Sequence, residues 1–285
     1  YAVLPECLAV DDLADAIADI STMYPTADEF HDDVDPVRNG RFRGDQFGGF
    51  DYLPFASPAW NLLAVHPRLI AVAREALGVD DVRLYQAESW AKYTGAADYE
   101  QVLHCDYGNH SIVVLTTDPA YGQIEMFLYL SDVGPGDGPT AVVSNRWTRD
   151  LPAVPTHLDR DRHEVLAAQE EVVTAAAGTL LVYRVDTFHR ATDMTAPRSA
   201  RYTLHLNFRT AAAEFALRRG WGHQANHPQW RPFVERLTPD QLGVFGFPTP
   251  GHAYWTAETL DGVQLRYPRL DLTPWRAAMP RTSGG

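Results

Sequence analysis

Between residues 82 and 209 the sequence consists of short apolar segments separated by turn residues, and this pattern constrains the fold more than any other feature. The segments are rich in β-branched and aromatic residues, as strands are. Glycine, proline and aspartate separate them, most clearly in the run GPGDGP at 134–139. Because no helices alternate with the segments, the pattern favours a sandwich or barrel over a parallel βαβ sheet. The predicted strands are 82–90, 111–117, 124–130, 140–143, 171–174, 179–184 and 201–209.

The regions on either side of these strands differ in character. Leu13, Ile17 and Ile20 are spaced for one apolar face, which predicts a helix at 10–23. A second helix is predicted at 59–77, because a proline precedes it and a glycine follows it.

The remaining segments complete the expected domain organisation. Residues 39–55 are rich in glycine and aromatics and predict a loop with short extended pieces. After residue 210 the chain is rich in Pro, Trp and His, which predicts a cap over the β core. We therefore expect one domain over 1–285, with a helical and loop region at 1–80, the β core at 81–210 and a C-terminal cap at 211–285.

Charge and cysteine content exclude several functions. The formal net charge is −13, whereas nucleic-acid and anionic-membrane partners require clustered Lys and Arg. No apolar run approaches the roughly 18 residues that a membrane span needs. Cys7 and Cys105 are too few for a disulfide framework, so a reducing, cytoplasmic location is expected. Lys92 is the only lysine in the chain.

The triplet His104-Cys105-Asp106 is the first candidate for a metal site. On an extended segment, side chains two residues apart share a face, so His104 and Asp106 can both reach one ion. An H-x-D triplet alone is weak evidence, and two others occur, beginning at His31 and His157. Both lie in charged stretches and are expected on the surface. The triplet at His104 differs because predicted strands flank it.

A third ligand and an anion anchor follow downstream. His189 comes shortly after the predicted strand 179–184 and can complete a two-His, one-carboxylate site that leaves positions open on an iron ion. Arg201 and Thr203 lie two residues apart on the next strand and therefore share a face. A guanidinium with a neighbouring hydroxyl suits the distal carboxylate of 2-oxoglutarate.

With these residues in place, the chain resembles the phytanoyl-CoA dioxygenase family of Fe(II)- and 2-oxoglutarate-dependent oxygenases, which includes ectoine hydroxylases and many natural-product hydroxylases. The resemblance covers about residues 60–210. It rests on YQAESWAKYTG (85–95), LHCDYG (103–108), LYLSDVGPGDGPTAVV (128–143) and AGTLLVYRVDTFHRAT with RSARYTLHLNF (177–208).

The resemblance implies a mainly β fold with flanking helices, built on a double-stranded β-helix (jelly-roll, cupin-like) core. It implies that His104, Asp106 and His189 bind iron and that Arg201 anchors 2-oxoglutarate. Lys92 matches a lysine that relatives commonly carry before the H-x-D segment. Gln86 matches a position that faces the substrate or co-substrate.

This sequence also departs from the family. Many relatives carry Pro-Gly-Ser-His where this chain has VSNRW at 143–147. Glu88 and Glu125 fall near positions where some relatives contact the co-substrate, and a carboxylate there would repel 2-oxoglutarate unless it faces away or pairs with an arginine.

The resemblance implies hydroxylation, desaturation or cyclisation of a small-molecule metabolite, with O2 consumed and succinate and CO2 released. Related halogenases replace the carboxylate ligand with Gly or Ala, so the presence of Asp106 favours this group of reactions. Bacterial members often act in secondary metabolism on small compounds. Substrate contacts are expected from His110, Trp90, Arg184 or Arg198, or from the C-terminal aromatics Trp221, Trp230 and Trp255. The alternatives are a cupin-type metal oxygenase or isomerase that does not use 2-oxoglutarate, and a non-catalytic binding protein on the same scaffold.

Overall fold

A computed structural model describes residues 1–114, 116–151, 158–216, 220–225 and 227–279. Its strands are β1 (Ala2–Leu4), β2 (Asp51–Tyr52), β3 (Val82–Tyr93), β4 (Gln123–Tyr129), β5 (Thr140–Val143), β6 (Glu170–Val173), β7 (Leu180–Arg184), β8 (His189–Ala191) and β9 (Ala200–Thr210). Its α-helices are α1 (Val10–Ala18), α2 (Ile20–Met23), α3 (Ala27–His31), α4 (Pro36–Gly40), α5 (Pro58–Leu63), α6 (Pro67–Leu77), α7 (Tyr107–His110), α8 (Arg160–Ala167), α9 (Trp221–Gln224), α10 (Trp230–Val234), α11 (Pro239–Gly243), α12 (Ala257–Arg266) and α13 (Thr273–Ala277). Two 3₁₀ helices, η1 (Pro119–Tyr121) and η2 (Asn145–Trp147), complete the set.

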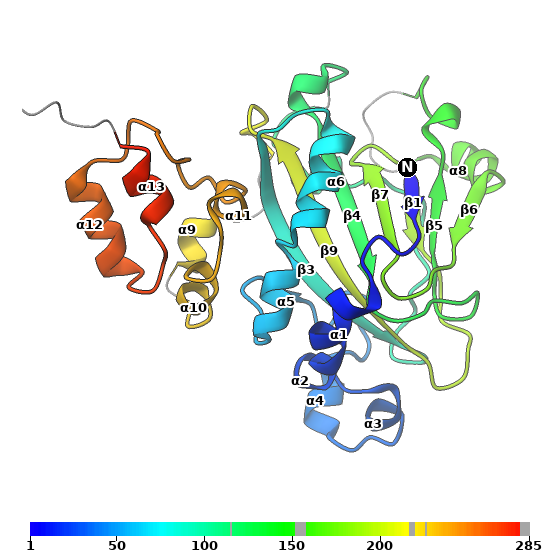
Figure 1. Cartoon of the computed structure of the whole chain (residues 1–285). Helices are drawn as coiled ribbons and strands as arrows, with labels where there is room; N and C mark the ends of the chain where they lie inside the picture. Colours follow the sequence, from blue (N-terminus) through cyan, green and yellow to red (C-terminus); the bar gives the residue numbers. More distant parts are fainter. Residues whose placement is uncertain (115, 152–157, 217–219, 226, 280–285) are drawn as a thin grey trace, which may run out of the picture.

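The strands form two antiparallel sheets (Figure 1). The larger sheet has the order β1-β7-β4-β9-β3-β2, and the smaller has the order β6-β5-β8. Side chains of both sheets meet in one buried cluster, with Phe127 and Tyr183 from the larger sheet and Val142 and Val173 from the smaller. The fold is therefore the predicted double-stranded β-helix with flanking helices.

Strand β9 shows how the larger sheet separates its two faces. Tyr202, Leu204, Leu206 and Phe208 are buried in the main apolar core. The residues that alternate with them point to the other face and are polar, yet they are buried as well: Arg201, Thr203, His205 and Asn207. A buried polar face inside a barrel is costly unless it binds something, so this face is where a functional site is expected.

Helices cover the outer, apolar face of the larger sheet (Figure 1). Helix α6 buries Leu69, Ile70 and Ala73 against this face. The C-terminal helices pack on the same side, where the Trp221 indole donates to the Leu84 carbonyl at 2.7 Å and Arg74 pairs with Asp240. Within the described residues, no helix is long and apolar enough to cross a membrane.

Six of the seven predicted strands match observed ones within a few residues, but the strand expected at 111–117 is wrong. The described part of that segment contains no strand, and Ile112 is 84% exposed. Its apolar composition resembles a strand, but β propensity reflects packing on a neighbouring strand, and the described residues of this segment have no such neighbour.

The helix expected at 59–77 is two helices, α5 and α6, and the helix expected at 10–23 is also two, α1 and α2. Pro67 begins α6, because proline disfavours helical geometry at the residue before it and suits a first helical position. The short strands β1 and β8 were not predicted, since three residues carry no periodicity of their own. Strand β2 lies in the segment at 39–55 that was predicted as a loop with short extended pieces.

Candidate active site

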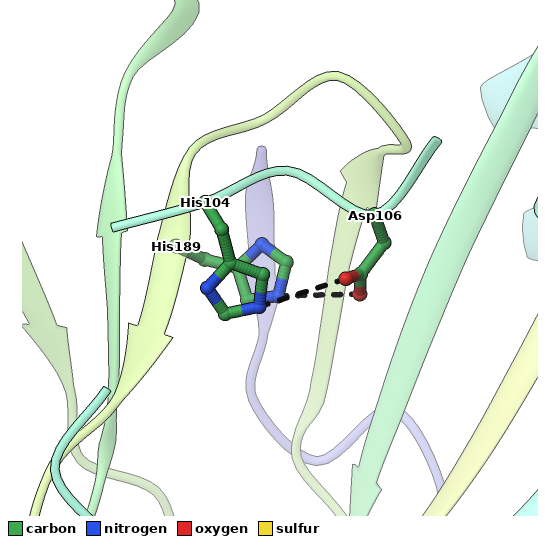
Figure 2. Close-up of side chains that lie close together, drawn as sticks. All are labelled: His104, Asp106 and His189. Carbon is green, nitrogen blue, oxygen red and sulfur yellow. Dashed lines mark ion pairs between the residues drawn. The ribbon is translucent and has the colours of Figure 1, made fainter. Parts of the chain in front are cut away.

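The three predicted metal ligands converge at one point on the inner face of the barrel. His104 Nε2 lies 3.6 Å from Asp106 Oδ1, and His189 Nε2 lies 3.4 Å from Asp106 Oδ2. The two imidazole rings are 4.7 Å apart between centroids. Figure 2 shows both rings beside the carboxylate. One ligand atom of each residue lies within 4.8 Å of the others.

Backbone pairing between distant segments brings these side chains together. His104 and His189 form an isolated antiparallel bridge, with the His104 amide donating to the His189 carbonyl at 3.0 Å and the reverse bond at 2.9 Å. The prediction that the whole triplet is extended is wrong at Asp106, which has φ −90° and ψ −6° and is the N-cap residue just before α7. The carboxylate nevertheless lies on the same side as His104, 3.6 Å from its Nε2 atom.

Hydrogen bonds fix which ring nitrogens face the shared point. His104 Nδ1 lies 2.8 Å from the Val102 carbonyl, and His189 Nδ1 lies 3.0 Å from the Thr187 carbonyl. A carbonyl can only accept, so each Nδ1 carries the proton and each Nε2 presents a lone pair. Two neutral imidazoles oriented in this way, with one carboxylate, form a ligand set suited to Fe(II).

The pKa shifts of Asp106 and His189 agree with a metal site at this point. Burial alone would raise the pKa of Asp106, but His189 above all, then His104 and His110, hold it below its usual value. Burial lowers the pKa of His189, and the stronger combined effect of Asp106 and the Thr187 carbonyl raises it. Asp106 is therefore a carboxylate. Without a metal, a proton on His189 balances its negative charge, and a metal cation between the rings would replace that proton.

A second group of possible ligands shares Asp106. Its ligand atoms, from Asp106, His110 and Glu125, also lie within 4.8 Å of one another. His110 Nδ1 is already 2.9 Å from the Tyr85 hydroxyl, and Glu125 Oε2 accepts from the Tyr183 hydroxyl at 3.2 Å. Burial first and Asp106 second raise the pKa of Glu125 well above its usual value, which favours a neutral acid. The group with two lone-pair nitrogens is the better metal site.

The ligands open onto a cavity of about 700 Å³ inside the barrel. This volume is in the range of small-molecule sites and exceeds what 2-oxoglutarate alone requires. Its lining includes the three ligands, Arg201, Glu88, Glu125, Trp90 and His205. Among the described residues, none after Asn207 contributes to the lining, so the C-terminal aromatics do not form the pocket wall that was expected.

Lys92 and Arg201 are two cations buried beside each other. They are cross-strand partners on β3 and β9, and their side chains are almost fully inaccessible. The Arg201 guanidinium donates to the Gly138 carbonyl. Within the described part of the chain, however, Arg201 Nε and Lys92 Nζ have no hydrogen-bond partner. Burial and then the charge of Arg201 lower the pKa of Lys92. Arg201 lines the cavity, whereas Lys92 is not part of the lining. A carboxylate beside Arg201 would give its orphaned donor a partner and add negative charge near Lys92.

The other two predicted co-substrate contacts, Thr203 and Gln86, lie outside the cavity lining. Thr203 shares the face of Arg201, but its hydroxyl is 3.0 Å from His205 Nε2, and Thr203 is not part of the cavity lining. Gln86 is buried with no hydrogen-bond partner for either amide atom among the described residues, and it too lies behind the lining.

The expected substrate contacts divide into two groups. Trp90 and His110 line the cavity. Arg184 instead pairs with Asp186, and Arg198 pairs with Asp28 and Asp32 on the surface. Of the other two H-x-D triplets, His31 ends α3 with its ring 3.4 Å from the Ser199 carbonyl, and His157 lies outside the described residues.

Sequence reasoning missed an aromatic wall of the cavity. Phe47, Phe50 and Tyr52 come from the segment read as loop, and all three line the cavity. Phe50 lies 4.4 Å from Trp90 between ring centroids. The only signal was the concentration of aromatics between glycines. The pairing of β2 with β3, which brings the wall to the site, is not visible in that local pattern.

Comparison with known proteins identifies a family and a shared fold. A family profile described as phytanoyl-CoA dioxygenase (PhyH) matches residues 1–202. A search of curated protein sequences found no significant match. The structure of the epimerase SnoN in complex with Fe3+, alpha ketoglutarate and nogalamycin RO is similar, with a TM-score of 0.55 and 18% identity over 74% of this chain and 78% of that chain.

Two further solved structures share the fold. EctD from S. alaskensis in its apoform has a TM-score of 0.54 and 19% identity over 77% of this chain and 78% of that chain. The carbocyclase SnoK from nogalamycin biosynthesis has a TM-score of 0.51 and 17% identity over 74% of this chain and 79% of that chain.

Proposed function

The chain belongs to the phytanoyl-CoA dioxygenase family of iron- and 2-oxoglutarate-dependent oxygenases, and from this premise we propose that it hydroxylates, desaturates or cyclises a small-molecule metabolite. The reaction would consume O2 and release succinate and CO2 from 2-oxoglutarate. The observation that carries the proposal is the convergence of His104, Asp106 and His189 on a cavity that also holds a buried arginine with an orphaned donor.

Each residue has a definite task in this proposal. His104, Asp106 and His189 hold Fe(II) through two Nε2 atoms and one carboxylate oxygen, and the carbonyls of Val102 and Thr187 keep the rings oriented. Bound iron supplies the oxidising chemistry by activating O2 at the expense of 2-oxoglutarate. The protein fixes the geometry and limits the access of water.

Arg201 binds the distal carboxylate of 2-oxoglutarate, and Lys92 supports it with a second positive charge. Arg201 Nε and Lys92 Nζ, which lack a partner within the described residues, are donors, and carboxylate oxygens are acceptors. Thr203 then acts through His205 and not by direct contact, because its hydroxyl already bonds that ring. Gln86 likewise supports the site without direct contact, because it is not part of the cavity lining.

The fold hosts more than one outcome, since neighbours are described as an epimerase and a carbocyclase. The presence of all three ligands favours a reaction that begins with oxidation at a C–H bond of the substrate. Cys7 and Cys105 are not joined in a disulfide, which agrees with work in a reducing, cytoplasmic setting.

The test is whether 2-oxoglutarate is consumed. Purified protein with Fe(II), ascorbate and O2 should convert 2-oxoglutarate to succinate slowly without substrate, and His189→Ala should lose this conversion. A metal enzyme that ignores 2-oxoglutarate would release no succinate above the His189→Ala background, and a non-catalytic binding protein would release none under any condition.

A further inference from the structure

A short loop, residues 44–50, carries two rings of the cavity's aromatic wall, and we term it the aromatic loop. Near its two ends it has glycines of positive φ, Gly44 at 80° and Gly49 at 77°, a conformation that glycine adopts without strain. Inside the loop, Asp45 Oδ1 accepts from the Phe47 amide at 2.9 Å. This local bond shapes the loop but does not attach it to the barrel.

Gln101 joins the aromatic loop to the strand that begins with a metal ligand. Gln101 Nε2 donates to Gln46 Oε1 at 2.9 Å. At its other end, Gln101 Oε1 accepts from the Ala191 amide at 2.9 Å, and the Gln101 amide donates to the Ala191 carbonyl at 3.2 Å. Ala191 belongs to β8, whose first residue is His189. Gln46, Gln101 and Ala191 all line the cavity.

The orientation of the two side-chain amides follows from their partners. The Ala191 amide can only donate, so the Gln101 atom that faces it must be the oxygen. The NH2 group of Gln101 therefore faces Gln46, which must offer its own oxygen. Because one arrangement satisfies every group, the bond between Gln46 and Gln101 depends on an acceptor at position 46.

The segment that carries Gln101 is itself fixed to the region around β8. The neighbouring Glu100 accepts from the Arg190 guanidinium and, at 3.1 Å, from the Asp193 amide. Arg190 also donates to Glu170 on β6 at 2.7 Å. Gln101 thus has a rigid base, and loss of its bond to Gln46 would release the loop and leave β8 in place.

The bond supports a stack of rings on the loop side of the cavity. The Phe47 ring lies 5.9 Å from the Trp90 ring and the Phe50 ring 4.4 Å from it, between centroids. Trp90 is only 7% exposed, whereas Phe47 is 52% exposed. A half-exposed ring gains little from burial, so stacking alone would hold the loop weakly. The burial of Trp90 therefore depends on a loop that needs a second attachment.

We propose that Gln101 is a positioning residue of this enzyme: through Gln46 it holds the aromatic loop against β8 and so keeps the apolar wall in the cavity that contains the metal ligands. The role in substrate binding rests on the proposed function, since the wall lies where a substrate would contact the cavity. Without the bond, the loop would open about Gly44 and Gly49 and would expose Trp90 to solvent.

Hydrogen exchange of residues 44–50, followed by mass spectrometry, tests the attachment. Gln46→Leu removes the acceptor and leaves the bond from Ala191 to Gln101, so exchange in the loop should rise about fivefold, the effect of one net hydrogen bond. Gln46→Glu keeps an acceptor on a stem of the same length and should restore the wild-type rate. Gln169→Leu makes the same replacement at a half-buried position outside the cavity lining and is the control. Unchanged exchange in Gln46→Leu, or an increase that Gln46→Glu shares, would overturn the proposal.

Two further measurements separate this attachment from a general loss of packing. Gln46→Leu combined with Gln101→Leu should exchange no faster in the loop than Gln101→Leu alone, because both variants break one bond. Additive increases would show that the two residues hold the loop independently and would contradict the proposal. Acrylamide quenching of Trp90 fluorescence, taken as the difference from a matched Trp90→Phe protein, should rise in Gln46→Leu and return in Gln46→Glu. Equal quenching in all three proteins would mean that the loop does not cover Trp90.

The exchange experiment requires no metal, so it fails or succeeds separately from the proposed function. Calorimetry gives the binding of Zn(II) and then of 2-oxoglutarate to the wild-type protein. A protein that binds both, but whose loop does not respond to Gln46→Leu, loses only the positioning role of Gln101. A protein whose loop responds, but which binds neither, keeps the attachment and loses the proposed function.

Discussion

Lys92 and Arg201 lie directly opposite each other on β3 and β9, two buried cations side by side in the barrel. Lys92 Nζ sits 4.2 Å from the Trp90 ring and 4.5 Å from the Tyr99 ring, and these contacts offset only part of the cost of burying its charge. In the proposed function, a carboxylate of 2-oxoglutarate supplies the missing negative charge.

Binding of 2-oxoglutarate should therefore stabilise the protein. At a concentration of 100 times Kd, the free energy of unfolding should rise by about 2.7 kcal/mol. Differential scanning fluorimetry with Zn(II) present measures the shift in Tm. The dimethyl ester of 2-oxoglutarate lacks both negative charges and is the control. Equal stabilisation by the ester would mean that the two cations do not bind a carboxylate.

Replacing the lysine should have opposite effects on the free and bound protein. Lys92→Met keeps the stem and removes the charge, so the protein without 2-oxoglutarate should gain about 1–4 kcal/mol of stability, as other buried charges do when replaced. The stabilisation by 2-oxoglutarate should shrink in the same variant. Chemical denaturation with and without 2-oxoglutarate measures both quantities. A less stable variant that keeps the full 2-oxoglutarate effect would show that Lys92 supports packing alone.

The lowered pKa of Lys92 also predicts a pH dependence. Between its folded pKa and 10.5, the unfolded chain binds a proton on Lys92 that the folded protein lacks. Stability without 2-oxoglutarate should therefore rise with pH across this window and fall as pH is lowered through it. The difference between wild type and Lys92→Met isolates this contribution from that of other groups. A difference that stays constant across the window would refute it.

The two overlapping ligand groups make different predictions for metal binding. His189→Ala should weaken Zn(II) or anaerobic Fe(II) binding by more than about a hundredfold, since even supporting residues of metal sites contribute 10–100-fold. His110→Ala should leave it within a few-fold. Calorimetric titration of both variants is the measurement. A larger loss of metal affinity in His110→Ala than in His189→Ala would place the metal between Asp106, His110 and Glu125.

The main core should respond as a close-packed interior. Leu206 on β9 is fully buried under the helices, so Leu206→Ala should cost about 2–5 kcal/mol. Val10 is 72% exposed at the start of α1, and Val10→Ala should change stability by less than about 0.5 kcal/mol. Urea denaturation compares the two. Similar losses of stability in Leu206→Ala and Val10→Ala would mean that the helices do not cover the β9 face in solution.

The parts of the fold that sequence could predict are those with strong local patterns. Strand β9 alternates apolar and polar residues, and its position was predicted from that pattern. The side chains of His104, Asp106 and His189, singled out by their residue types and their place among the strands, lie together in the structure, and their role as metal ligands stays a prediction. The parts that were missed depend on pairing between distant segments. Phe50 and Tyr52 reach the cavity only because two residues of β2 pair with β3, and no local pattern encodes that contact.

Thr203 shows a second limit of prediction from the sequence. Its face on β9 follows from its spacing to Arg201, as predicted, but its hydroxyl bonds His205 instead of pointing into the cavity. Choice of partner among buried polar groups depends on distances of a few tenths of an ångström, which spacing does not determine. Polar residues at alternate positions of a buried strand were nevertheless a usable signal for His205 and Asn207.

The most direct test is an anaerobic titration of the Fe(II)-loaded protein with 2-oxoglutarate, monitored for the weak metal-to-ligand charge-transfer band in the visible. The band should appear in the wild type and should be lost in His189→Ala, which lacks a metal ligand, and in Arg201→Ala at the same 2-oxoglutarate concentration. If Fe(II) binds but no band forms at any 2-oxoglutarate concentration, the central claim is contradicted, and the protein is a metal enzyme of another kind.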